Sequence, residues 1–283
     1  MSRGLPLSTR GLVHLYHSEG HDVAALSGVD LHVGAGEMVG LLGPSGAGKS
    51  TLLSLLGGLL RPSAGRIFVG DVELSRLAGR EVDRLRSGTI ALMLQGAARN
   101  LLPYLGVREN VAFAQAAARA AGVHEIPAVD DVLETVGMLD HGDAALGALT
   151  PGQLQLAAVA AAVATEPAVL LADEPTSQLD HRARDTVLAT MARINRELGT
   201  TVLIVTHDPD VATRLPRTVT IRDGRIGGEG RSGEEYAVVT ADGFLPLPAH
   251  VLPDLPPGTL VRLQRDDDAY RLLPVDGPAP EHR

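Results

Sequence analysis

The chain has 283 residues, enough for one large domain with a small appendage. Hydrophobic residues make up 45% and charged residues 21% of it, a globular composition that excludes disordered and collagen-like proteins. The formal net charge of −9 argues against a general nucleic-acid-binding surface, and the absence of cysteine excludes disulfides and thiolate metal sites.

No apolar run approaches the roughly 20 residues that are needed to cross a bilayer. The most apolar stretch, at 156–164, is short and rich in alanine, which predicts a buried helix. The first residues lack the apolar segment of a secretory signal. We therefore expect a soluble, cytoplasmic protein.

The first informative element is a short apolar run at 38–42, which predicts a buried strand. It leads into Gly-Pro-Ser-Gly-Ala-Gly-Lys-Ser at 43–50 and then into a segment of helical composition at 51–56. This is a G-x-x-x-x-G-K-[ST] phosphate loop in its required strand–loop–helix setting. The loop predicts the following nucleotide-binding residues: Gly43, Pro44, Ser45, Gly46, Ala47, Gly48, Lys49, Ser50 and Thr51.

Within this loop, Lys49 is expected to reach the β- and γ-phosphates and Ser50 to ligate Mg²⁺. Lys49 is the only lysine of the chain, and the other 24 basic side chains are arginines. A compact ammonium fits a tight phosphate cradle in a way that the wide, planar guanidinium does not. The sequence therefore predicts ATP and Mg²⁺ as the ligands of this loop.

A second apolar run, at 168–172, predicts another buried strand, and it ends in Asp173 and Glu174. A carboxylate at the end of such a strand can hold Mg²⁺, which suits Asp173. Glu174 then stands where a general base can polarise an attacking water. Acidic turns often follow strands, but downstream of a phosphate loop this pair predicts catalysis.

A third apolar run, at 201–205, ends in Thr206 and His207. A single histidine at the end of a strand is commonly a structural residue. A third parallel strand, however, brings its carboxyl end to the sheet edge where ligands bind in open α/β sheets. We therefore expect His207 to contact the γ-phosphate.

The C-terminal part of the chain changes in pattern. Residues 221–226 predict a hairpin, and Gly-Gly-Glu-Gly at 227–230 predicts a linker after it. Alternation typical of β-strands follows over 234–274, with a turn expected at Asp242-Gly243 and a loose tail at 276–283. The pattern around Asp242 and Pro257-Gly258 is weakly similar to the AbrB-type swapped-hairpin module.

That module binds DNA in other proteins, but charge argues against DNA binding here. Residues 231–283 carry five arginines against nine acidic residues, the wrong sign for phosphate contact. We expect no nucleic-acid partner and interpret the segment as a dimerisation or regulatory hairpin, with a passive β extension as the alternative.

Further segments, in order along the chain, are similar to the ABC ATPase family over residues 10–228. Leu92-Met-Leu-Gln95 resembles the Q-loop, and Leu149-Thr-Pro-Gly-Gln153 stands at the position of the signature. Ser177-Gln-Leu-Asp180 resembles the D-loop. Tyr16 resembles the aromatic residue that stacks on adenine, with ordinary packing of a half-buried ring as the alternative. The sequences at 22–30 and 206–210 are similar to those of the lipoprotein-release and macrolide-export branch of this family.

The resemblance implies a fold and a domain organisation. The expected fold class is α/β, a P-loop NTPase with a RecA-like core, an N-terminal antiparallel β portion and a helical subdomain at about 96–160. The ATPase domain is expected to cover 1–228. A linker, a small β-hairpin appendage and a tail are expected over 229–283.

The resemblance also implies partners. A second ABC ATPase subunit packs head to tail and supplies Thr150, Gly152, Gln153 and Asp180 to the nucleotide, while Gln95 ligates the metal and senses the γ-phosphate. Transmembrane permease subunits hold the protein at the inner face of the plasma membrane. The segments 100–103 and 107–111 resemble the part that contacts the permease, with a plain loop-to-helix connection as the alternative.

The signature departs from the family pattern, because Leu-Thr-Pro-Gly-Gln replaces Leu-Ser-Gly-Gly-Gln. In one interpretation, Pro151 disables the segment, and the chain is a nucleotide-gated scaffold or one half of an asymmetric heterodimer. In the other, Thr150 caps a helix, Pro151 takes the first helical position, and Thr150 and Gln153 form a capping box. Both interpretations stay open from the sequence. A further alternative, a soluble ABC protein of repair or translation, usually carries two cassettes, and this chain has one.

Overall fold

The computed structural model describes residues 4–18, 21–231, 234–239, 243, 245–247, 251–256, 258–267 and 269–275. Among these residues the central feature is a seven-stranded sheet in the order β11-β10-β9-β3-β8-β7-β6. Strands β9, β3, β8, β7 and β6 are parallel, and β10 and β11 are antiparallel. The strands of this sheet are β3 (Met38–Leu42), β6 (Ile90–Met93), β7 (Val169–Asp173), β8 (Thr201–Val205), β9 (Arg217–Arg222), β10 (Arg225–Arg231) and β11 (Glu234–Ala237).

The middle strands are buried on both faces. Along β7, Val169 and Leu171 pack into one hydrophobic cluster, whereas Leu170 and Ala172 pack into another on the opposite face. Strands buried on both faces appear in the sequence as continuous apolar runs, since neither face reaches water. This is why the runs at 38–42 and 201–205 coincide with β3 and β8.

One face of the central sheet is covered by helix α1 and a second sheet. The second sheet has the strand order β2-β1-β4-β5 and is antiparallel. Leu7, Leu26 and Leu52 pack in the cluster that joins this sheet to α1 and to the central sheet. The elements are β1 (Leu7–Ser18), β2 (His21–Val33), α1 (Lys49–Leu56), β4 (Ala64–Val69), β5 (Val72–Glu73), the short helix η1 (Leu74–Arg76) and α2 (Gly79–Gly88).

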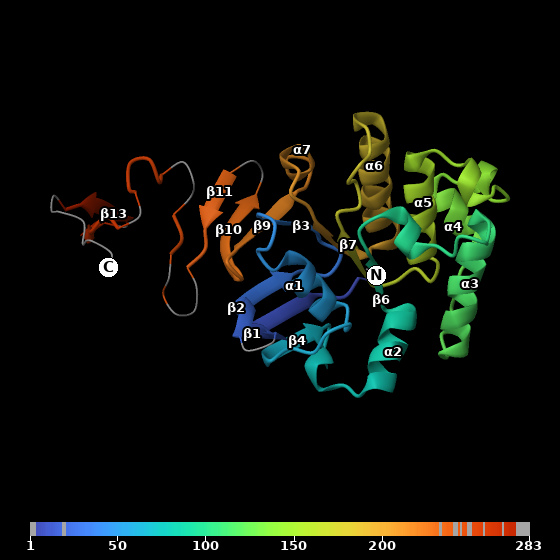
Figure 1. The fold of residues 1–283 in the computed structure, drawn as a ribbon, viewed down its shortest axis with the longest axis horizontal. Coiled ribbons are helices and arrows are strands. Elements are labelled where there is room, and N and C mark those ends of the chain that lie inside the picture. The colour runs from blue at the N-terminus through green and yellow to red at the C-terminus, as the bar shows by residue number, and fades with distance from the viewer. Residues whose placement is uncertain are drawn as a thin grey trace.

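The other face packs against helices α3 to α6, which Figure 1 shows grouped together on the side away from the C-terminus. Their apolar side chains meet Leu170 and Ile204 of the sheet. Of the alanine-rich stretch at 156–164 that was expected to form a buried helix, residues 156–162 lie in α5, and the last two residues lie beyond it. The elements of this part are η2 (Ala97–Asn100), α3 (Val107–Ala120), α4 (Val129–Val136), η3 (Leu139–His141), η4 (Leu146–Ala148), α5 (Pro151–Ala162), α6 (His181–Leu198) and α7 (Pro209–Ala212).

The prediction of a linker at 227–230 is wrong, because these residues lie within strand β10. Glu229 accepts two hydrogen bonds from Arg217 of β9, with Nε–Oε1 at 2.9 Å and Nη2–Oε2 at 3.1 Å. This bidentate hydrogen bond is the largest influence on the pKa of the Glu229 carboxyl, and it holds that pKa below its ordinary value. The sheet then continues into β11, so the central sheet extends beyond residue 228.

The last strands, β12 (Val261–Asp266) and β13 (Ala269–Pro274), form a separate antiparallel hairpin. Part of the pattern that is similar to a swapped hairpin, namely Asp242, Phe244, Pro248 and Pro257, lies outside the described residues, as does the tail at 276–283. Throughout the part of the chain that is described, no helix combines the length and the apolar character of a membrane span.

Candidate functional site

A cavity of about 480 Å³ lies at the edge of the central sheet where β3, β7 and β8 end. It collects residues from separate parts of the sequence because the carboxyl ends of parallel strands meet at one edge. Of the predicted site residues, Tyr16, Ser45, Gly46, Gly48, Lys49, Ser50, Thr51, Gln95, Asp173, Glu174 and His207 line it. The others, Gly43, Pro44, Ala47, Thr150, Gly152, Gln153 and Asp180, are not among its lining residues.

The phosphate loop wraps around the side chain of Lys49. Lys49 is 8% exposed, and its ammonium donates to the carbonyls of Gly43 at 2.7 Å and Pro44 at 2.8 Å. Helix α1 begins at Lys49, and its N-cap, Gly48, has a φ of 96°. A Cβ at Gly48 would lie 2.5 Å from the carbonyl oxygen of Ala25, so a side chain has no room there. The N-terminus of α1 therefore opens on the cavity beside a buried ammonium.

Asp173 and Glu174 occupy the end of β7, opposite the loop. Asp173 is the last residue of the strand. Glu174 is 9% exposed and has a φ of 48°, a left-handed conformation that costs energy in a residue other than glycine. Its backbone N–H donates to the carbonyl of Val205 in β8 at 3.0 Å, which fixes the strained turn to the neighbouring strand.

His207 follows β8 and pairs with Glu174. The distance between His207 Nδ1 and Glu174 Oε1 is 2.5 Å, and the imidazole is largely exposed to the cavity. A base candidate and a histidine thus share one hydrogen bond at the mouth of the site. Such a pair can take part in acid–base chemistry at this end of the cavity.

Tyr16 lies at the entrance, on β1. Its hydroxyl is 3.2 Å from the Thr51 hydroxyl of α1, and its ring meets the ring of His14 edge-on, with centroids 4.8 Å apart. Tyr16 is half-exposed, although its ring contacts His14. Beside it, Val23, Ala24 and Ala25 of β2 also line the cavity, and the sequence analysis did not predict them as site residues.

Gln95 follows β6 in a loop that is clamped by one side chain. Asn100 accepts a hydrogen bond from the Leu94 N–H at 2.8 Å, and its amide donates to the carbonyls of Leu94 and Gly96 at 2.8 and 3.0 Å. The side chain of Asn100 is therefore used inside the loop. The sequence did not predict this role, since the 100–103 segment was interpreted as a surface for a partner, with a plain loop-to-helix connection as the alternative.

The segment with the altered signature starts helix α5. Thr150 is the N-cap, Pro151 is the first helical residue, and Thr150 and Gln153 form the expected capping box. Gln153 Oε1 accepts from the Thr150 N–H at 2.9 Å, and its amide nitrogen lies 2.8 Å from His141 Nε2. A Cβ at Gly152 would lie 2.8 Å from Cβ of Ala183 on α6, so glycine allows the two helices to approach here.

The site residues fit a magnesium ion bound together with phosphates. Mg²⁺ takes oxygen ligands and is commonly held by one or two protein groups plus substrate phosphates. Ser50, Gln95 and Asp173 line the same cavity and offer a hydroxyl, an amide and a carboxylate oxygen. Over the described residues, no group of three or more His, Asp or Glu side chains forms a metal site made by protein alone.

Comparisons with known proteins agree with this geometry. Residues 26–177 match the family model described as ABC transporter. The chain is 39% identical over 222 residues to the lipoprotein-releasing system ATP-binding protein LolD 1 of Caulobacter vibrioides, covering 78% of this chain and 94% of that protein. It is 36% identical over 258 residues to the methionine import ATP-binding protein MetN of Rhizobium etli, covering 91% of this chain and 71% of that protein.

Solved structures give a similar result. One neighbour is the dimeric post-hydrolysis state of an ATP-binding cassette bound to ADP and phosphate. It aligns with a TM-score of 0.68 at 28% sequence identity and covers 80% of this chain and 98% of the neighbour. The expected P-loop NTPase fold is therefore confirmed.

Proposed function

Because the chain belongs to the ABC transporter family, as an ATP-binding subunit with an ABC ATPase domain, we propose that it powers export through separate membrane subunits. The cargo class that we propose is a lipoprotein, lipid or drug-type molecule. The similarity to LolD 1 supports export, since it extends over 94% of that protein, whereas the similarity to MetN leaves 29% of MetN unmatched.

The single observation that carries ATP hydrolysis is the cavity that joins Lys49, Asp173, Glu174 and His207. In this proposal the loop backbone and Lys49 bind the phosphates, and Glu174 takes the proton of the attacking water. His207 contacts the γ-phosphate and orients Glu174, and Tyr16 stacks on adenine. Bound Mg²⁺, held by Ser50, Asp173 and Gln95, would neutralise phosphate charge.

We further propose that Thr150, Gly152, Gln153 and Asp180 serve the nucleotide of a second subunit. They do not line their own chain's cavity, yet they lie at the starts of α5 and α6. Backbone N–H groups at a helix start attract anions. The dimeric cassette among the structural neighbours supports a head-to-tail pair. A heterodimer with a different cassette is the alternative, and purification of the chain paired only with itself would argue against it.

Pro151 is compatible with a working signature, because the first helical residue needs no N–H partner within the helix. We expect Pro151→Gly to change the rate of ATP hydrolysis by less than about threefold. We also expect it to destabilise the fold by about 0.4–1 kcal/mol, since glycine increases the entropy of the unfolded chain. Phosphate release and thermal melting measure the two effects. A large increase in turnover would instead show that Pro151 disables the segment.

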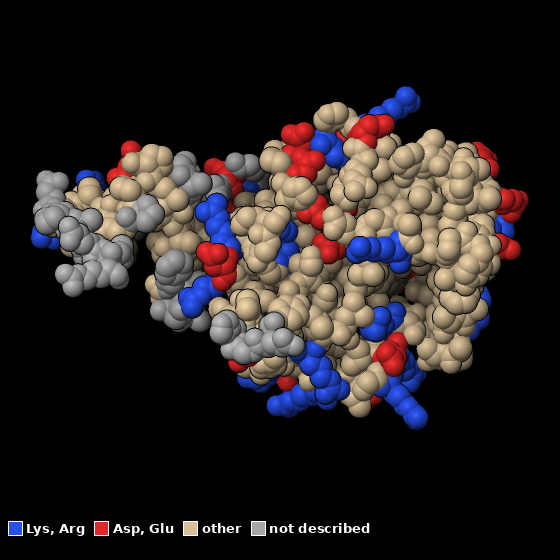
Figure 2. All heavy atoms as spheres, viewed as in Figure 1, with Lys and Arg blue, Asp and Glu red and all other residues tan. Residues whose placement is uncertain are grey.

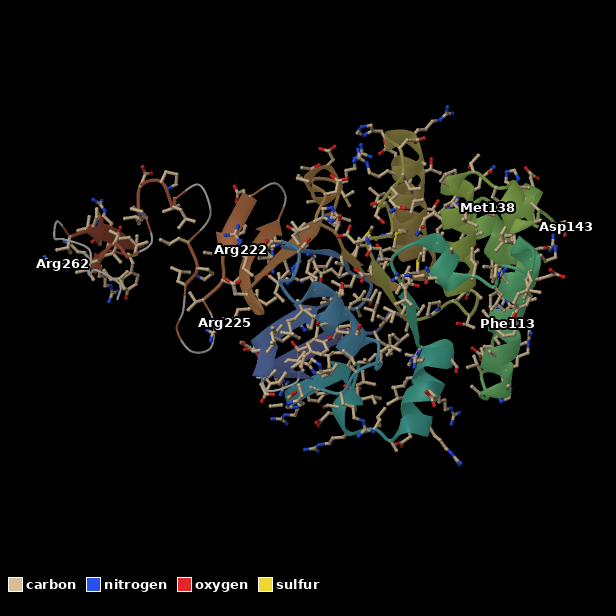
Figure 3. All side chains as sticks on the ribbon, in the orientation of Figure 1. Phe113, Met138, Asp143, Arg222, Arg225 and Arg262 are labelled. Carbon is tan, nitrogen blue, oxygen red and sulfur yellow. The ribbon has the colours of Figure 1, made fainter. Side chains whose placement is uncertain are left out.

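The surface near the Gln95 loop offers a contact area for a permease. Leu94, Tyr104 and Phe113 are exposed apolar side chains, and Figure 3 shows Phe113 on α3. Figure 2 shows mostly uncharged atoms over the part of the molecule that holds α3 to α5. Exposed apolar side chains within a mostly uncharged part of the surface favour a protein interface. We propose that the permease binds this surface, so that its movement reaches Gln95 through the loop held by Asn100.

The cargo can be tested with the chain and its permease in proteoliposomes. We expect an acylated lipoprotein to stimulate ATP hydrolysis and free methionine to leave the rate unchanged. The control is the same complex carrying Glu174→Gln. Stimulation by methionine with no response to lipoprotein would contradict the export proposal and favour import.

A further inference from the structure

Arg184, on the first turn of α6, is a buried charge outside the cavity that the proposed mechanism does not yet use. The residue is 7% exposed. Its Nη1 donates to Asp208 Oδ2 at 2.8 Å, and its Nη2 lies 2.7 Å from His181 Nδ1 and 3.4 Å from Asp210 Oδ2. A guanidinium can only donate, so His181 Nδ1 is the acceptor and the proton of the neutral ring is on Nε2.

Asp208 is the residue directly after His207, and each of its carboxylate oxygens has a separate partner. Oδ2 accepts from Arg184, while Oδ1 accepts from the Asp210 N–H at 2.9 Å and caps α7. Burial acts to raise the pKa of Asp208, but the bonds from the Asp210 backbone and from Arg184 lower it below its ordinary value. Asp208 is therefore held as a carboxylate that joins two helices.

This contact fixes the backbone beside His207. The Asp208 N–H also donates to the Thr206 hydroxyl at 3.1 Å, so the residues on both sides of His207 are bound to each other. His207 itself is exposed and contacts Glu174 through Nδ1. An exposed imidazole has few packing contacts to hold it, so its position depends on this backbone.

The same turn of α6 touches two other proposed functional segments. Asp180, at the end of the 177–180 segment, caps α6 by accepting from the Ala183 N–H at 2.8 Å. Ala183 also packs against Gly152 at the start of α5, where the space for a Cβ is absent. The first turn of α6 therefore meets the signature segment, the 177–180 segment and the loop of His207.

We propose that Arg184 is a positioning residue that sets His207 against Glu174 by tying the loop after β8 to the first turn of α6. This inference rests on the proposed ATPase function. In this inference, the position of His207 depends on the first turn of α6. That turn contacts the signature segment and the 177–180 segment, which we propose serve the nucleotide of the second subunit. Arginine is required because two nitrogens of the fork serve three acceptors, whereas the ammonium of lysine is a single point charge.

The test is steady-state ATP hydrolysis and ATP binding by the purified full chain. We expect Arg184→Gln and Arg184→Lys to lower kcat by about 10- to 100-fold, because a small misplacement of a catalytic group is costly. The Kd for MgATP should stay within about twofold of wild type, since no residue of the phosphate loop is touched. A loss of ATP affinity that follows a lowered melting temperature would indicate a merely structural role and would overturn the proposal.

A double-mutant cycle with His207→Ala tests whether Arg184 acts through His207. In that background Arg184→Gln should lower kcat no further, because the group that it positions is gone. Additive losses would overturn the proposal.

Arg214→Gln is the matched control. Arg214 forms an ion pair with Asp185 on α6, whose carboxylate also lies 3.8 Å from Arg184 Nε, but Arg214 is exposed and bonds to neither Asp208 nor Asp210. We expect its kcat to stay within about twofold of wild type, because exposed ion pairs contribute little. A wild type without ATP binding would contradict the proposed function itself, whereas an active wild type with unchanged Arg184 variants would contradict only this inference.

Discussion

Replacing Glu174 with glutamine is expected to lower the rate of ATP hydrolysis by about 10²- to 10⁴-fold, the range that a general base contributes. Glutamine keeps the size of the side chain and a hydrogen-bonding oxygen but cannot accept the proton of the attacking water. Glu174 is buried, held in a strained conformation and bonded to His207, so the side chain is already placed for this task. MgATP binding should remain, because Lys49 and the loop are unchanged.

Phosphate release under single-turnover conditions measures the loss, and calorimetry with MgATP measures the binding that should be retained. Glu197→Gln, an exposed acid near the end of α6, is the control and should hydrolyse ATP like wild type. Normal turnover by the Glu174 variant would remove this residue from the role of base. It would favour a mechanism in which another group takes the proton.

The parts of the site that follow buried strands could be predicted from local sequence. The runs at 38–42 and 201–205 match β3 and β8, and the run at 168–172 differs from β7 by one residue at each end. Strands buried on both faces give apolar runs without alternation, and the end of a run marks the end of the strand. Glycine spacing then identified the phosphate loop, because few other loops need that pattern.

The edge of the sheet was not predictable in the same way. A glycine-rich sequence such as that at 227–230 usually indicates a loop, yet here it lies within β10. These residues pair with the preceding strand β9, where the Arg217 side chain binds Glu229 bidentately. Local composition carries no information on such a contact. Strand propensity depends on neighbours more than on the strand itself.

The residues that hold the site in place were also missed. Asn100 clamps the Gln95 loop, Val23 to Ala25 form one wall of the cavity, and Arg184 joins α6 to the residue after His207. Asn100 acts through local bonds within its own loop, whereas Arg184 acts through tertiary contacts, and the resemblance of nearby segments to the family did not predict these positioning roles. Motifs name the groups that touch substrate, and the groups that orient them become visible only in the fold.

The role of the C-terminal hairpin stays a prediction. In its register Leu263 pairs with Leu272 and Val261 pairs with Pro274, so these four apolar residues share one face of the two strands. Leu263 and Val261 are exposed. Figure 3 shows the neighbouring Arg262 on this hairpin, at the far end of the molecule from α3. A two-stranded hairpin is marginally stable alone, which is consistent with the dimerisation or regulatory role expected from the sequence.

Lys49 should govern nucleotide affinity more than any other single side chain. We expect Lys49→Ala to weaken MgATP binding by about 10- to 100-fold, because each charge-assisted hydrogen bond to phosphate contributes about 1.5–3 kcal/mol. Lys49→Arg should weaken binding as well. The ammonium is buried between the carbonyls of Gly43 and Pro44, at distances of 2.7 and 2.8 Å, and the loop closes tightly around it.

Isothermal titration calorimetry with MgATP at neutral pH compares the three proteins, and Arg80→Ala on α2 is the control for the loss of one positive charge. This helix lies outside the cavity, so the control should bind ATP like wild type. The comparison of Lys49→Ala with Lys49→Arg is the informative one. At every other basic position the chain carries its positive charge on one of 24 arginines, without an ammonium group. If Arg restored full affinity, charge alone would suffice at this position. Weak binding by both variants would mean that the loop requires a compact donor, which is the physical reason to find the only lysine of the protein here.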